Sequence, residues 1–140
     1  MSAATDVLFP WSEDYSVNIG IIDTQHKNLV NIINELHVAM ITGKAKQDLG
    51  IILGNLVKYT QVHFKTEENL MESRRYPDYA SHKVQHEQLT KTVLDFEGKF
   101  QRNELGLTID VMDFLKAWLG KHILGSDKKY TAFLNSKGVR

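Results

Sequence analysis

The chain has 140 residues, the usual length of a single domain with a core of its own. Apolar residues make up 42% of it and charged residues 24%, and the 17 basic residues balance the 17 acidic ones. This balance, with no basic run, argues against nucleic-acid binding. The absence of cysteine excludes disulfides, iron–sulfur clusters and thiolate metal sites, so any metal must be held by nitrogen and oxygen.

The N-terminal stretch gives no sign of targeting. Residues 1–11 contain Asp6 and Pro10 and have neither a basic start nor a long apolar run, so we expect no signal peptide. No later segment is apolar enough to span a bilayer, which predicts no membrane insertion. We therefore expect a cytoplasmic protein. We also expect a monomer, because no long exposed apolar stripe is visible.

The hydrophobic pattern predicts an all-α protein in which an irregular arm, residues 1–18, precedes a bundle, residues 19–134. The first helix is expected to begin near Ile19–Asp23 and to run to about Ile41. Asp23 is its predicted N-terminal cap, because an aspartate side chain accepts hydrogen bonds from the free amides of a first helical turn.

Three more helices are predicted along the rest of the chain. Helical periodicity covers about residues 46–73, 79–102 and 108–124, and residues 126–134 are expected to form a short terminal helix after Gly125. The loops between the long helices are short, so neighbouring helices should be antiparallel. The sequence therefore predicts one domain over residues 1–140, an up-down-up-down four-helix bundle with an N-terminal arm.

Five of the six histidines fall on the inward stripes that otherwise carry apolar residues. The set consists of His26 in the first helix, His63 and Glu67 in the second, His82 and His86 in the third, and His122 in the fourth. A spacing of four places both members of a pair on one helix face, about 6 Å apart along the axis. One such pair is usually a simple helix-face contact. Polar groups on all four inner stripes, however, are costly to bury unless they are bonded. Imidazoles and carboxylates between helices can hold metal ions, so the pattern predicts a two-metal site.

Two residues near this set are separated from it by helix geometry. His37 lies about three turns after His26, roughly 16 Å along the axis, and cannot reach the same site. It is interpreted as a core or edge residue without a metal role. Glu68 points about 100° away from Glu67, so it is either solvated or a partner of a ligand rather than a ligand itself.

Asp127 is a candidate ligand only if the fourth helix is interrupted. It comes five residues after His122, and a regular helix would place the two about 140° apart. A break near Gly125 would bring both to one site. The alternative is an ordinary aspartate at a helix end, next to Lys128 and Lys129.

These motifs resemble the hemerythrin family, in particular its single-domain bacterial members. The matching residues are Trp11, Tyr15-Ser16-Val17, Ile22-Asp23-x-Gln25-His26-Lys27, His63-Phe64-x-x-Glu67-Glu68, Tyr76-Pro77, His82-x-x-x-His86 and Trp118-Leu119-x-x-His122-Ile123-x-x-x-Asp127. They extend over nearly the whole chain and are highly specific. Asn18 stands where the family often has glycine, a difference that affects the arm and not the site.

The resemblance implies a non-heme di-iron centre. One iron would be bound by His82, His86 and His122, and the other by His26 and His63, with Glu67, Asp127 and a solvent-derived oxo or hydroxo group bridging the two. The first iron would then have six donors and the second five, which leaves one position open for O2. The identity of the metal comes from the resemblance, because the same ligands also suit zinc, manganese or cobalt.

The function that the resemblance implies is reversible O2 binding, without enzymatic turnover, for oxygen storage, transport or delivery to an oxygen-consuming client protein. The five imidazoles and two carboxylates favour ferrous iron, whereas di-iron oxidases use carboxylate-rich sets with a Glu-x-x-His motif that does not occur here. An oxygen or redox sensor acting through a separate partner, a di-iron enzyme (peroxidase, nitric oxide or iron oxidation) and a plain structural bundle are the alternatives. An apolar lining is expected from Phe64, Trp118, Leu119 and Ile22 or Leu29, although Trp118 fits simple core packing equally well.

Overall fold

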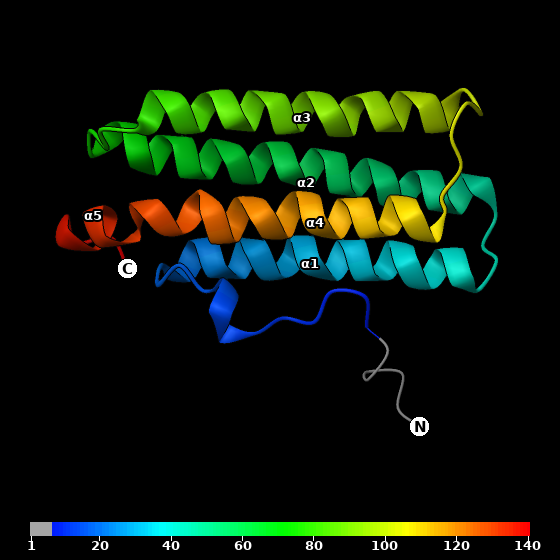
Figure 1. Cartoon of the computed structure of the whole chain (residues 1–140), viewed down its shortest axis with the longest axis horizontal. Helices are drawn as coiled ribbons and strands as arrows, with labels where there is room; N and C mark the ends of the chain where they lie inside the picture. Colours follow the sequence, from blue (N-terminus) through cyan, green and yellow to red (C-terminus); the bar gives the residue numbers. More distant parts are fainter. Residues whose placement is uncertain (1–6) are drawn as a thin grey trace.

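The computed structural model describes residues 7–140 and shows four long helices lying side by side (Figure 1). These are α1 (Gly20–Ile41), α2 (Lys46–Ser73), α3 (Tyr79–Gln101) and α4 (Ile109–Gly125). Each runs in the opposite direction to the one before it, and α2 packs against both α1 and α3 while α4 contacts α1 (Figure 1). The predicted up-down-up-down bundle is confirmed, and the bounds of its four long helices lie within a residue or two of those expected. The short terminal helix begins at Thr131, five residues later than predicted, because residues 127–130 form a 3-10 turn.

The start of α1 differs from the prediction. The helix begins at Gly20 with Ile19 as its N-terminal cap, and no side chain caps it. The prediction that Asp23 is the cap is therefore wrong, because Asp23 lies one turn inside the helix. Its carboxylate accepts hydrogen bonds from the backbone N–H of Val17, at 2.8 Å, and from the hydroxyl of Ser16, so it ties the arm to the helix instead.

The described part of the arm, residues 7–18, lies along the outside of the bundle (Figure 1). It contains a short 3-10 turn, η2 (Glu13–Tyr15), and residues 1–6 of the predicted arm lie outside the described residues. The side-chain amide of Asn34 donates to the carbonyl of Phe9 and accepts from its N–H, both at 2.9 Å. Asn18 has a φ of +55°, a left-handed conformation that asparagine and glycine adopt more readily than other residues.

The C-terminal segment confirms the predicted interruption of the fourth helix. Helix α4 ends at Gly125, and a 3-10 turn, η3 (Asp127–Tyr130), leads into a short helix, α5 (Thr131–Ser136). The N–H of Ser126 still bonds to the carbonyl of His122, whereas the N–H of Lys129 bonds to the carbonyl of Ser126, so the regular α-helical bonding ends immediately before Asp127. Packing extends past the predicted end of the bundle, since Val139 is buried. Between residues 7 and 140, no helix is both long and apolar enough to cross a membrane.

Candidate metal centre

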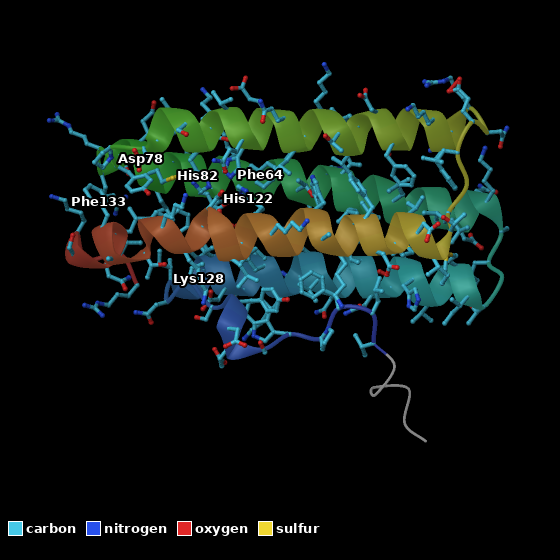
Figure 2. The ribbon with its side chains drawn as sticks, in the orientation of Figure 1. Phe64, Asp78, His82, His122, Lys128 and Phe133 are labelled. Atoms are coloured by element: carbon cyan, nitrogen blue, oxygen red, sulfur yellow. The ribbon has the colours of Figure 1, made fainter. Side chains whose placement is uncertain are left out.

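The seven predicted ligand side chains meet inside the bundle. None of them is more than 6% exposed, although the surrounding core is apolar. They come from all four long helices and from the first residue of η3, and Figure 2 shows His82 and His122 between the helices beside Phe64. The break after Gly125 places Asp127 in this cluster. The structure therefore favours Asp127 as a candidate ligand over the alternative of an ordinary aspartate at a helix end.

The cluster divides into two groups, within each of which one nitrogen or oxygen atom per residue lies within 4.8 Å of the others. One group consists of His82, His86, His122, Glu67 and Asp127, and the other of His26, His63, Glu67 and Asp127. The two carboxylates belong to both groups. These two groups have the same members as the two sets of candidate ligands that the sequence resemblance implied.

The carboxylate of Asp127 faces both groups. Its Oδ1 lies 2.9 Å from Nε2 of His82 and 3.0 Å from Nε2 of His122, and its Oδ2 lies 3.1 Å from Nε2 of His26. One oxygen is thus directed at the three-histidine group and the other at the two-histidine group. This is the arrangement required of a bridging carboxylate.

Glu67 joins the groups in a different way. Its Oε1 lies 3.2 Å from Nε2 of His63 and 3.2 Å from Nε2 of His86, so a single oxygen stands between a histidine of each group. Its Oε2 accepts a hydrogen bond from the phenol of Tyr130 and lies 4.0 Å from Nε2 of His26.

The donor atoms fit a bound metal because they have no other partner. The Nε2 atoms of all five histidines, Oε1 of Glu67 and both carboxylate oxygens of Asp127 are buried and make no hydrogen bond within the described residues. Their separations are short, yet none has hydrogen-bond geometry. Each buried unpaired polar atom costs about 1–3 kcal/mol, and nitrogen and oxygen donors converging on a common point are what a divalent transition metal requires.

The two carboxylates are held ionised in the absence of metal. Burial and the nearby Asp127 oppose the ionisation of Glu67, but His63 and His86 outweigh them and keep its pKa below the usual range. Burial likewise opposes the ionisation of Asp127, and His122, His26 and His82 hold its pKa well below the usual range. Ionised carboxylates are the form that binds metal.

Three residues around the ligands were missed or left open by the sequence. Tyr130 was not predicted, although side chains three apart eclipse one another in a 3-10 turn, which gives Tyr130 the same face as Asp127. Gln25, next to His26 in the sequence, instead accepts from Nδ1 of His63 at 2.7 Å. Of the two interpretations of Glu68, hydrogen bonding to a ligand is the observed one, because its Oε2 lies 2.9 Å from Nδ1 of His86.

Of the expected apolar lining, Phe64 is in direct contact with the cluster. The ring of Phe64 is stacked on the imidazole of His86, with centroids 3.9 Å apart and an angle of 3° between the planes, and its edge meets His122. Ile22, Leu29 and Leu119 are buried in the hydrophobic core of the bundle. Trp118 is 8% exposed and borders a surface groove together with His122, so it serves in the core and at the rim of the site.

His37 lies away from the cluster, as its distance from His26 along the helix predicted. It is partly exposed on α1 and belongs to neither ligand group.

Fold and site together define a helical-bundle protein with a candidate two-metal centre, and the comparisons with known proteins agree. The family model of the hemerythrin HHE cation binding domain matches residues 17–134. A bacteriohemerythrin from Methylococcus capsulatus is 34% identical over 130 residues, which are 92% of this chain and 98% of that protein. One from Stenotrophomonas maltophilia is 37% identical over 123 residues, 88% of this chain and 79% of that protein. A wild-type hemerythrin crystal structure has a TM-score of 0.85 at 34% identity and covers 91% of this chain and 98% of its own.

The chain belongs to the hemerythrin family. The matched region contains all seven residues of the cluster, which supports a metal-binding role for them.

Proposed function

We propose that this protein binds O2 reversibly at a di-iron centre. His82, His86 and His122 would hold one iron and His26 and His63 the other, while Glu67 and Asp127 would bridge them, together with a solvent-derived oxo or hydroxo group. When bound, the iron pair supplies the electrons that hold O2. The observation that carries the proposal is the sharing of two carboxylates by a three-histidine group and a two-histidine group, which leaves one half of the centre a donor short.

The residues around the centre favour binding over turnover. Five imidazoles are neutral ligands and only two carboxylates add negative charge, a set that stabilises the lower oxidation state of the metal. Phe64 stacks on His86, and Ile22 and Leu119 are buried in the core of the bundle, so apolar side chains limit the access of bulk water to the centre. Exclusion of water slows the loss of bound O2 as a reduced product.

The physiological role that fits these properties is oxygen storage, transport or delivery to an oxygen-consuming client. One domain over residues 1–140, a monomeric state and a cytoplasmic location complete the proposal. The bacteriohemerythrin relatives from two bacterial species support the oxygen-binding role and not an enzymatic one.

The test is a metal analysis followed by absorption spectroscopy of the purified protein. We expect two irons per chain and a reduced form that is colourless without air. On exposure to O2 a visible band should appear and should vanish when O2 is removed. Steady oxygen consumption, or immediate conversion to a ferric form without a reversible band, would contradict the proposal and favour a di-iron enzyme or a redox sensor.

A further inference from the structure

One histidine in each half of the centre makes a hydrogen bond through its Nδ1 atom to a side chain outside the cluster. Nδ1 of His86 lies 2.9 Å from Oε2 of Glu68, and Nδ1 of His63 lies 2.7 Å from Oε1 of Gln25. In both rings the other nitrogen, Nε2, lies 3.2 Å from Oε1 of Glu67. Each imidazole therefore has one nitrogen bound to its neighbour and the other directed at the candidate metal position.

The orientation of the Gln25 amide is fixed by a chain of hydrogen bonds. Its Nε2 donates to Oγ1 of Thr66 at 3.3 Å, and Thr66 donates its own hydroxyl hydrogen to the carbonyl of Val62 at 3.2 Å. Since that hydrogen is already used, Thr66 can only accept from Gln25. The amide oxygen must then face His63, which places the imidazole proton on Nδ1 and leaves Nε2 free to bind metal.

Glu68 sets the same tautomer on His86 but adds a charge. An ionised carboxylate can only accept hydrogen bonds, so His86 must carry its proton on Nδ1. The Glu68 side chain is 14% exposed, so its charge is only partly solvated. A hydrogen bond from an imidazole to a carboxylate is stronger than one to a neutral amide, and it makes the other ring nitrogen a better metal donor.

We propose that Glu68 and Gln25 are positioning residues that make the two halves of the centre unequal, with the three-histidine half the more electron-rich. This inference rests on the metal centre proposed above. It goes beyond that centre by specifying which half binds metal more tightly and which of the two ions is oxidised first. The negative charge behind His86 favours the higher oxidation state in the three-histidine half. The neutral amide behind His63 leaves the half with the open position in the lower one.

The first experiment is a calorimetric titration of the metal-free protein with Co²⁺. Glu68→Gln keeps an acceptor oxygen at the same reach and removes only the charge. We expect it to weaken one of the two Co²⁺ binding steps about 10- to 100-fold and to leave the other unchanged. Gln25→Glu places a carboxylate behind His63 and should tighten the weaker step. Glu72→Gln is the matched control, because Glu72 is exposed one turn further along α2 and loses the same charge.

The second measurement is the midpoint potential of the iron-loaded protein. A general loss of packing would not predict the direction in which this potential changes, whereas the loss of a negative charge does. The potential of the first one-electron oxidation should rise in Glu68→Gln and stay constant in Glu72→Gln. In the double variant Gln25→Glu with Glu68→Gln, net charge is unchanged and the order of the two halves should reverse.

The outcomes separate this inference from the metal centre itself. A wild-type chain that does not take up two Co²⁺ ions overturns the centre and the asymmetry together. Two ions bound in every variant, with Glu68→Gln indistinguishable from Glu72→Gln in both affinity and potential, overturn the asymmetry alone.

Discussion

The phenol of Tyr130 donates a hydrogen bond to Oε2 of Glu67 and so joins the C-terminal turn η3 to helix α2 at the candidate metal centre. Tyr130 is 0% exposed and Glu67 1%. Burial raises the pKa of Tyr130 well above its ordinary value, and Glu67 and Asp127 raise it further, so the phenol keeps its proton and remains a donor.

Replacing Tyr130 with phenylalanine tests this contact. Tyr130→Phe keeps the ring but leaves Oε2 of Glu67 buried without its donor. We expect the metal-free protein to lose about 1–3 kcal/mol of its free energy of unfolding, measured by urea denaturation. Tyr59→Phe is the control, because the Tyr59 hydroxyl bonds to Asn28 at an exposed position and its loss should change stability by no more than about 0.5 kcal/mol. Equal effects of the two substitutions would contradict the role of Tyr130.

Removal of the carboxylate shared through one oxygen should destroy the two-metal centre. Glu67→Ala deletes a donor that both ligand groups contain, so we expect the iron content to fall from two per chain to one or none. Elemental analysis of the purified variant measures this directly. An intact two-iron spectrum in Glu67→Ala would rule out the bridging assignment.

His37→Ala is the corresponding test of a histidine that lies outside the site. His37 is on the same helix as His26 but belongs to neither ligand group. The variant should retain two irons per chain and the wild-type spectrum. A loss of iron would show that His37 supports the centre in a way that its position does not indicate.

The fold and the clustering of the seven candidate ligands were predictable because both depend on spacing along single helices. Pairs four residues apart, His63 with Glu67 and His82 with His86, share a face in any α-helix. Asp127 required one more step, a break at Gly125, and the break could be inferred because a continuous helix would have turned Asp127 away from His122. Periodicity does not report contacts between helices, so the partners of the ligands were harder to find.

Gln25 and Asp23 show this limit. Gln25 is adjacent to His26 in the sequence, yet its amide supports His63 on another helix, and no spacing rule relates the two. Asp23 has the chemistry of a helix cap, but its carboxylate bonds to Val17 and Ser16 of the arm. In both cases the side-chain type was informative, and its partner depended on where a second segment packs.

The stability of the metal-free protein should decrease in acid because of Asp127. Despite burial, the surrounding histidines hold its folded-state pKa well below the value of about 3.9 expected in the unfolded chain. The unfolded state therefore binds the proton first as the pH falls. The stabilising contribution of Asp127 is fully present above about pH 4 and is lost progressively below it.

Thermal denaturation of the metal-free protein between pH 5 and 2 should show a falling midpoint, and Asp127→Asn should flatten this dependence. An identical slope in Asp127→Asn would contradict the ionic role of Asp127.

Phe64 should protect the centre from solvent as well as stabilise the core. It is 4% exposed, and its ring covers one face of the His86 imidazole. Phe64→Ala should cost about 3–5 kcal/mol of the free energy of unfolding, because it leaves a cavity that the neighbouring helices cannot fully close.

The cavity left by Phe64→Ala also admits water beside the candidate ligands. We therefore expect bound O2 to be lost faster by oxidation of the centre, measured as the decay of the oxygenated absorption band. Phe114→Ala removes the same ring from a position that is 49% exposed, so it should have a much smaller effect on stability. A decay rate that is unchanged in Phe64→Ala, in a variant that still binds two irons, would show that Phe64 acts only through packing.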